Sequence, residues 1–344
     1  MPGVGVHYWN DARGKPGGVA GLDFGAQIPR NLLVNGGFTV NQRGAPISGG
    51  SGFVCDRWWA STNSPLFVVQ VIPPSFSSSF SAAFLEFGQA NAGNTAIVRY
   101  AGIESIDAIK LTNQTLTLAV SYNNRVQGVS TLSVKVVMGT GTNQNFTTSG
   151  SYATGNSVLA SMSIDLSVFG TQTTQVLSFN TPSNLSEISL QFDYACVSPG
   201  FVDALFILGV SLAQGNVAIP YNVYSFEMEL AGCQRYFQRF NIVPNLFQPI
   251  GSGQCFSAVQ CVIFLPLKPN MRTTPTPTQK GLLAVTAAGG AVTPVTSLVN
   301  FAGQVSPEKS ALVIGVAGGL AAGSATYLFS NNDTTGDVFL DAEL

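Results

Sequence analysis

The sequence is short of charge. Charged residues make up 9% of the 344 positions, against roughly 25% in an average soluble domain. The 15 Lys and Arg residues nearly balance the 17 Asp and Glu residues, which gives a formal net charge of −2. Nucleic-acid-binding proteins need a basic surface to neutralise phosphates, so this balance excludes nucleic acid as the partner. The 45% of hydrophobic residues excludes a disordered chain.

Side chains for catalysis or metal binding are also scarce. The one histidine, His7, lies in a glycine-rich terminal segment, which is a poor base for a zinc site or a Ser-His-Asp triad. No glycine-rich phosphate loop precedes a helix. A polysaccharide depolymerase needs two carboxylates across one sugar ring. Asp193 and Asp203 are candidates, but nothing in the sequence pairs them. We therefore expect a protein that is not an enzyme and has no metal or cofactor.

The cysteines do not form a disulfide framework. Their number is odd and their spacing wide, unlike the even, tightly spaced set of a secreted disulfide-rich domain. Cys255 and Cys261 are the only close pair, and they have no CxxC motif or neighbouring histidine. We expect buried thiols in a chain that folds in a reducing compartment. The five residues are Cys55, Cys196, Cys233, Cys255 and Cys261.

No targeting or membrane segment is expected. The first 18 residues lack the basic stretch and apolar core of a signal peptide. Residues 310–332 carry no charge, and Gly315, Gly319 and Gly323 have the spacing of a packed membrane helix. Half of the run SATYLFSNN is polar, however, and the glycines suit two short strands joined by a turn. We therefore expect no membrane insertion.

The chain is rich in short strand-like runs. About nine runs of five to eight apolar or alternating residues lie between residues 31 and 222, separated by Gly, Asn, Ser or Pro. Six more follow residue 240. Such spacing is typical of a β-sandwich or jelly roll. Residues 269–279, PNMRTTPTPTQ, contain three prolines and are expected to form a loop or a sheet edge.

One segment has helical periodicity, which predicts a helix over residues 225–238. Ser225 is placed to cap it. Glu227 and Glu229 fall in its first turn and Arg235 and Arg239 in its last, where each sign of charge favours the helix dipole. An apolar stripe recurs at three- to four-residue spacing: Phe226, Leu230, Cys233 and Phe237.

These patterns predict an all-β protein with two β-sandwich, jelly-roll-like domains joined by one short α-helix and preceded by an extended N-terminal arm. We assign residues 1–30 to the arm, 31–222 to a jelly-roll β-sandwich, 223–239 to the connecting helix and 240–344 to a C-terminal β-sandwich. With so little charge, apolar patches on these domains are expected to meet in an oligomer.

The N-terminal arm has seven glycines and no strand or helix periodicity, but it carries the aromatic pair Tyr8 and Trp9. Two interpretations are open. The arm is a solvated tail, or it orders on a partner and uses the two aromatic side chains as anchors. We favour the second, because exposed aromatic rings on a free tail gain nothing.

Three clusters together resemble proteins of tailed bacteriophages. NLLVNGGFTVNQRG (31–44) and CDRWW (55–59) are similar to the opening of a module of tail fibres and related appendages. AIPYNVYSFEMELAGCQRYFQRF (218–240) is similar to its end. PNMRTTPTPT (269–278) with NNDTTGDVFLDAEL (331–344) resembles the β-domain that often follows. The likeness spans about residues 31–344, although the long middle matches only in style.

The chain departs from that pattern in two places. The family often has Gln-Leu-Glu before the helix, where this chain reads Ser-Leu-Ala-Gln at 211–214. It often has Thr-Pro-Phe-Glu, where this chain reads Ile-Pro-Tyr-Asn at 219–222. These departures affect side-chain roles more than the fold.

The resemblance implies a virion structural protein with a carbohydrate-binding-like jelly roll, frequently a homotrimer. The function that it favours is that of a tail fibre or spike-like appendage that attaches to the host surface, with glycan as the partner there. The arm would bind other tail or capsid proteins, and the chain would be made in the host cytoplasm. Two alternatives stay open: a purely structural head fibre, capsid decoration or tail component without receptor binding, and a polysaccharide depolymerase.

The aromatic and charged residues of CDRWW are the candidate site residues. Trp58 and Trp59 are adjacent in a strand and point to opposite faces, and the motif favours Trp58 for the core. Trp59 either stacks on a sugar ring or lies under a loop or at a subunit interface. Asp56 and Arg57 bind a polar ligand or, as we expect, pin one strand to the next. Elsewhere, Glu227, Arg235 and Arg239 are expected to stabilise the helix or a subunit contact.

Overall fold

The computed structural model confirms an all-β protein with only short helices among the described residues. The arm, with His7, Tyr8 and Trp9, lies outside the described part, and so do Asp203 and Asn222. The structure describes residues 30–43, 45–73, 83–88, 91–126, 129–166, 169–198, 204–221, 224–241, 246–267, 269–286, 290–303 and 305–343.

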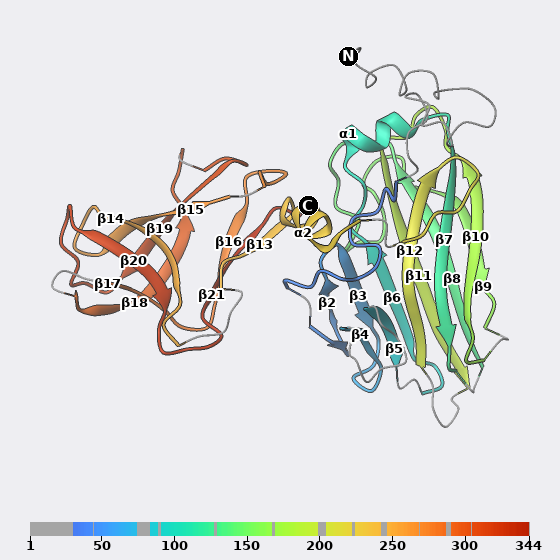
Figure 1. The fold of residues 1–344 in the computed structure, drawn as a ribbon, viewed down its shortest axis with the longest axis horizontal. Helices are drawn as coiled ribbons and strands as arrows, with labels where there is room; N and C mark the ends of the chain where they lie inside the picture. Colours follow the sequence, from blue (N-terminus) through green and yellow to red (C-terminus); the bar gives the residue numbers. More distant parts are fainter. Residues whose placement is uncertain are drawn as a thin grey trace, which may run out of the picture.

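Two six-stranded antiparallel sheets form the predicted sandwich (Figure 1). In order across the first sheet lie β1 (Ile47–Ser48), β4 (Val68–Ile72), β5 (Phe84–Gly88), β12 (Ala204–Gln214), β7 (Thr115–Asn124) and β10 (Gln172–Asn180). In order across the second sheet lie β2 (Ser51–Cys55), β3 (Trp58–Thr62), β6 (Thr95–Tyr100), β11 (Glu187–Ser198), β8 (Val129–Gly139) and β9 (Ser157–Ile164).

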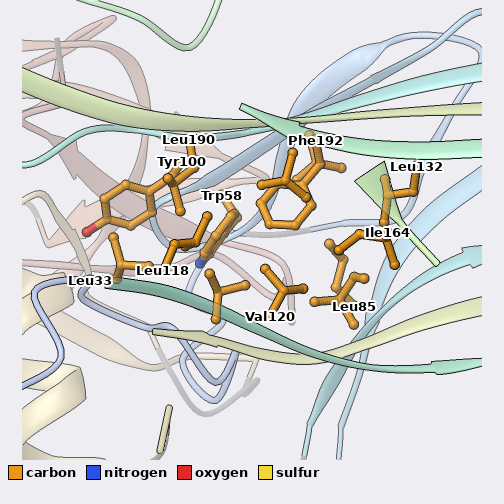
Figure 2. Close-up of a cluster of buried hydrophobic side chains, with 14 of the residues drawn as sticks. Leu33, Trp58, Leu85, Tyr100, Leu118, Val120, Leu132, Ile164, Leu190 and Phe192 are labelled. Carbon is orange, nitrogen blue, oxygen red and sulfur yellow. The ribbon is translucent and has the colours of Figure 1, made fainter. Parts of the chain in front are cut away.

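The sandwich core is built around Trp58, as the sequence predicts. Alternate residues of both sheets point inward, and Figure 2 shows Trp58 between Leu118 and Val120 of β7 on one side and Tyr100 and Phe192 on the other. Its ring centroid lies 5.1 Å from that of Tyr100 and 5.9 Å from that of Phe192. Such aromatic contacts add to the burial of apolar area, so Trp58 joins the two sheets.

The C-terminal part is a closed barrel rather than the predicted second sandwich. Six strands close because β14 pairs with both β15 and β20. Gly251 and Gly253 of β14 have no room for a Cβ atom, which would meet side chains or backbone of β15 within 2.7 Å; glycine allows this close approach where the sheet curves. In order around the barrel lie β14 (Pro249–Cys255), β15 (Gln260–Pro266), β19 (Lys309–Val316), β18 (Val292–Asn300), β17 (Leu283–Thr286) and β20 (Ala325–Ser330).

A three-stranded sheet connects barrel and sandwich, with β21 (Asp337–Asp341) between β13 (Phe237–Arg239) and β16 (Thr276–Lys280). The segment with three prolines therefore supplies an edge strand, as expected. Near the start of β7 lie a four-residue helix, α1 (Ser105–Ala108), and the 3-10 turn η1 (Ile109–Leu111). Residues 310–332 contain β19, a turn and β20, which confirms two strands. Among the described residues, no helix has the length and apolar character that spanning a membrane requires.

The connecting helix α2 (Phe226–Gln234) is shorter than predicted. The Ser225 hydroxyl accepts a hydrogen bond from the Met228 N–H at 3.4 Å, which confirms the cap. The helix ends at Gln234 because Phe237–Arg239 pair with β21. The predicted apolar stripe is confirmed only in part: Cys233 faces inward and Leu230 is half-buried, but Phe226 is 54% exposed and the buried face includes Glu229. The local periodicity of the sequence could not reveal that residues 237–239, predicted as the last helical turn, instead form a strand that pairs with β21, about a hundred residues later.

Two buried arginines join the sandwich to the end of the chain, which lies beside α2 in Figure 1. Arg57 binds the carboxylate of Glu343 and is 2% exposed. Arg43 lies 3.0 Å from Asp341 and 3.3 Å from Glu343. Aromatic rings cover both guanidinium groups. The guanidinium carbon of Arg57 lies 3.5 Å from the centre of the Tyr236 ring. We call Arg43, Asp56, Arg57, Asp341 and Glu343 the junction.

Removing one partner of a buried ion pair leaves the other charge unpaired. We expect Glu343→Ala to lower the free energy of unfolding by about 3 to 5 kcal/mol, measured by urea denaturation with tryptophan fluorescence. Glu308→Ala, at an exposed glutamate, should change it by less than about 0.5 kcal/mol. The double variant Arg57→Met/Glu343→Leu should regain most of the loss, because both members of the pair are removed while Arg43 keeps Asp56 and Asp341 as partners. A Glu343→Ala protein as stable as the control would contradict this role.

Candidate functional site

Trp59 lies on the outer face of the second sheet but is covered. It is 8% exposed, and the guanidinium carbon of Arg99 lies 5.0 Å from the centre of its ring. Arg99 in turn donates hydrogen bonds to the carbonyl oxygens of Thr147 at 2.7 Å and Thr148 at 3.1 Å. The ring therefore lies beneath an arginine and a loop, and stacking of a sugar on it requires Arg99 to move.

Asp56 and Arg57 occupy the turn between β2 and β3 and do not pair with each other. Both are buried, and Arg57 has a φ of +71°. Asp56 accepts a hydrogen bond from the Gln42 N–H at 2.6 Å and lies 3.7 Å from Arg43 Nε, while Arg57 binds Glu343 and the Gly102 carbonyl. The expectation that they pin neighbouring strands is wrong, because their partners are distant segments. Their burial also leaves no opening for a polar ligand.

Asn35 is the central residue that sequence reasoning missed. It lies fully buried at a φ of +61°. Its side-chain amide donates to the carbonyls of Val40 and Asp56, both at 2.8 Å, and its own carbonyl accepts from Trp58 Nε1 at 2.9 Å. Its N–H donates to the Glu229 carboxylate at 2.6 Å. The Asn-Gly-Gly sequence indicated only a turn, but this turn ties the two segments of the first cluster, 31–44 and 55–59, to Glu229 of the second cluster.

The charged residues of the predicted helix have other partners. Arg235 lies 3.0 Å from Glu104, and Arg239 pairs with Asp337 of β21. Neither arginine belongs to the last turn of α2, so the prediction that they stabilise the helix through its dipole is wrong. Their role in a subunit contact stays a prediction. Glu227 is exposed, and its own backbone N–H together with the Ser225 hydroxyl lowers its pKa.

A mainly polar surface, interrupted by Ile97, covers the outer side of the second sheet. Strand register places Arg99, Gln191, Lys135 and Ser161 side by side in one row across β6, β11, β8 and β9. In a second row, Asp193 lies opposite Ser133, and Ser133 opposite Ser163. We call these residues, with Ser61 at the β3 end of the second row, the polar face: Ser61, Arg99, Ser133, Lys135, Ser161, Ser163, Gln191 and Asp193.

The long side chains of the polar face hold one another in place. Arg99 Nε donates to Gln191 Oε1 at 2.9 Å, and Gln191 Nε2 donates to Asp193 Oδ1 at 2.7 Å. Lys135 Nζ lies 2.7 Å from Asp193 Oδ2. Burial lowers the pKa of Arg99, which Asp193 partly opposes. Lys135 and Asp193 stay accessible, at 39% and 27% of their side-chain area. The network thus presents oriented donors and acceptors at a protein surface.

The geometry of the polar face suits binding better than hydrolysis. The acids of β11 that point to this side are Glu187 and Asp193, six residues and therefore about 20 Å apart along the strand. Glycoside hydrolysis needs two carboxylates within about 5 to 10 Å. Glu187 is also buried, and it accepts hydrogen bonds from the backbone N–H and side chain of Gln144.

A second candidate site is a pocket of about 1190 Å³ at the end of the sandwich. It lies where the described chain begins, and charged residues of both signs line it: Arg30, Asp107, Lys110 and Glu229. Met228 also lines it, and the elements that contribute to its lining carry further exposed apolar side chains: Ile106 of α1, Ile109 of η1 and Phe226 of α2. Their exposure gives this end of the sandwich the character of a protein-contact surface.

The sequence matches no protein-family model and no curated protein. Solved structures show a distant similarity to carbohydrate-binding β-sandwich proteins. A candidate sugar-binding protein from Bacteroides thetaiotaomicron is 10% identical, with 54% of this chain and 100% of that chain covered and a TM-score of 0.36. A family 11 carbohydrate-binding module from Clostridium thermocellum is 9% identical, with 49% and 98% covered and a TM-score of 0.29.

A phage protein is among the similar structures as well. The enzymatically active domain of tailspike protein 4 from bacteriophage CBA120 is 14% identical, at a TM-score of 0.36. The match covers 54% of this chain and 21% of that one, so it spans about a fifth of the tailspike chain.

The buried carboxyl of Asp56 should make folding depend on pH. Burial raises the pKa of Asp56 from 3.8 to about 6, although Arg43 and the Gln42 N–H lower it. The folded protein therefore holds this proton more tightly than the unfolded chain does, and stability falls as pH rises from about 4 to about 6, by roughly 3 kcal/mol.

Asp56→Asn removes this ionisation. We expect urea denaturation across that range to show a weaker loss of stability with rising pH than in the wild type, whatever the constant cost of the substitution. Asp107→Asn, at an aspartate of α1 whose side chain is 49% exposed, should keep the wild-type pH dependence. Parallel curves for Asp56→Asn and the wild type would show that Asp56 does not titrate in this window.

Proposed function

We propose that this protein is a non-enzymatic appendage of a tailed-bacteriophage virion, a tail fibre or spike that attaches to a host-surface glycan through the polar face of a jelly-roll sandwich. The observation that carries the proposal is the network of Arg99, Gln191, Asp193 and Lys135, which spans the two rows, is linked by hydrogen bonds and an ion pair, and is open to solvent at Lys135 and Asp193. The phage context rests on the three sequence clusters.

Sugars fit the chemistry of this face. Neighbouring sugar hydroxyls both donate and accept hydrogen bonds, and planar amide, carboxylate and guanidinium groups can meet two of them at once. The serines around the row offer further hydroxyls without bulk. Arg99, the further charge of the polar face, is 8% exposed and bound to Gln191 and the Thr147 carbonyl. Lys135 offsets Asp193, so the exposed pair carries no net charge, which suits a neutral polyhydroxyl ligand. An anionic polymer would need a basic surface.

A purely structural role is the second candidate, and the pocket end of the sandwich favours it. The exposed side chain of Met228 lines that pocket together with Arg30, the last residue of the arm, and three further exposed apolar side chains lie on α1, η1 and α2. This arrangement is suited to contacts with other virion proteins or with further copies of the chain in a homotrimer. The two roles use different surfaces and are compatible with each other.

Truncating the polar face should weaken glycan binding. A hydrogen bond to a charged group contributes about 1.5 to 3 kcal/mol, so we expect Lys135→Ala and Gln191→Ala each to lower affinity for purified host surface polysaccharide by about tenfold or more. Titration calorimetry measures the effect. Lys309→Ala, at an exposed lysine of the barrel strand β19, is the matched control and should bind as the wild type does.

Three results would redirect the proposal. Wild-type protein that neither binds the polysaccharide nor blocks phage adsorption supports the structural role. Binding that survives both substitutions moves the glycan site away from the polar face. Release of reducing sugar ends from the polysaccharide indicates a depolymerase.

The arm is expected to hold the protein in the virion, with Tyr8 and Trp9 as its contacts. Deletion of residues 1–28 should abolish incorporation into particles, because the anchor is lost, while the remaining chain keeps its folded circular dichroism spectrum. Immunoblotting of purified virions measures incorporation. A Tyr8→Ala/Trp9→Ala variant tests the two rings separately, and truncated protein present on virions at the wild-type level would refute anchoring.

A further inference from the structure

Cys255 and Cys261 face each other in the hairpin that joins β14 to β15. The strand register sets them directly opposite, so their side chains lie on the same side of the hairpin. Both are buried and free. Five residues, 256–260, separate them in the chain, and the side chains of Phe256 and Val259 in this connection are exposed.

The backbone hydrogen bonds show which kind of cross-strand pair this is. The Cys255 N–H donates to the Ser324 carbonyl at 2.9 Å, and the Cys255 carbonyl accepts from the Gly323 N–H at 2.7 Å. Both groups of Cys255 therefore point away from Cys261. In an antiparallel ladder such a pair is not hydrogen-bonded and has Cα atoms about 4.5 Å apart. This separation lies within the range that a disulfide spans without backbone movement.

We propose that Cys255 and Cys261 are an oxidation site, at which a small peroxide converts the two thiols into a disulfide that closes the hairpin. One thiol is first oxidised by hydrogen peroxide to a sulfenic acid, with release of water. The second thiol then attacks that sulfur, forming the S–S bond and releasing a second water. Two thiols lose two electrons and two hydrogens, and one peroxide is reduced.

The surroundings of the pair keep it reduced until an oxidant is supplied. Burial, together with the neighbouring Cys255, raises the pKa of Cys261 to about 12. A protonated thiol is a weak nucleophile, so the pair should react slowly at neutral pH. The chain can therefore fold with free thiols and be oxidised later.

The disulfide would restrain one rim of the barrel. The carbonyl of Val259 accepts a hydrogen bond from Val316 at 2.9 Å, and that of Ala258 accepts from Leu320 at 3.1 Å. The hairpin connection is therefore bonded to the segment between β19 and β20. A disulfide between Cys255 and Cys261 would hold β14 to β15 at the end of the hairpin, close to the neighbouring strands β19 and β20.

The remaining cysteines serve as internal comparisons. Burial raises the pKa of Cys55 and Cys233 well above the ordinary value. They lie in β2 and α2, with no strand register that sets them opposite each other, and Cys196 lies in β11. Oxidation of the folded protein should therefore select the hairpin pair.

The test treats reduced full-length protein with hydrogen peroxide, removes the peroxide, denatures the protein and alkylates the remaining thiols with iodoacetamide for intact-mass spectrometry. We expect three of the five cysteines to be alkylated, and peptide mapping to place the missing pair at residues 255 and 261. Cys255→Ser and Cys261→Ser should each form no disulfide at the hairpin, where the remaining cysteine stays a thiol or stops at the sulfenic acid. Cys233→Ser should still lose two alkylated cysteines.

The thermal midpoint provides a second measurement. Peroxide should raise it for the wild type and for Cys233→Ser but not for Cys255→Ser, and a thiol reductant should reverse the rise. Five alkylated cysteines in the wild type, a pair that maps to Cys55 and Cys233, or sulfinic acids at both hairpin positions would each overturn the proposal.

Discussion

The buried charge of Arg57 is the constraint on which the rest of the structure depends. A guanidinium group that is 2% exposed is tolerable only with a carboxylate and further hydrogen-bond acceptors beside it, because an unpaired buried charge costs several kcal/mol. Glu343, at the far end of the chain, and the Gly102 carbonyl supply them. Burial disfavours the charged form, but Glu343, Tyr236 and Tyr100 outweigh it and raise the pKa of Arg57 above its ordinary value. The sandwich is thereby tied to the last strand.

The five residues CDRWW connect this junction to the sandwich core and to the polar face. Asp56 and Arg57 form the junction turn, Trp58 enters the sandwich core, and Trp59 supports Arg99 at one end of the polar face. Alternation along β3 sends the two tryptophans to opposite sides of one sheet. A change in the Asp56–Arg57 turn would therefore displace Trp58 in the core and Trp59 beneath the polar face together.

Local patterns in the sequence predict the strands but not their partners. Alternating runs mark most strands of the sandwich, and Trp58 could be assigned to its core. Arg57 and Glu343 are 286 positions apart, and no local pattern in a single sequence pairs them. The barrel was missed for the same reason: a sandwich and a barrel share strand spacing, and only the pairing of β14 with β20 closes the sheet. The polar face likewise needs the register of β6, β11, β8 and β9.

The few charged residues of the chain are distributed unevenly over the structure. Of the 15 Lys and Arg and 17 Asp and Glu residues, five form the junction, where Arg43, Asp56, Arg57 and Glu343 are shielded from solvent and the side chain of Asp341 is 38% exposed. Binding a ligand or another subunit strips water from a surface, and each unpaired charge there adds a desolvation cost. A polar face that offers serines, an amide and an internally paired Lys135–Asp193 avoids most of that cost. The protein thus concentrates buried charge where the sandwich meets the end of the chain and presents mainly neutral hydrogen-bonding groups on the polar face.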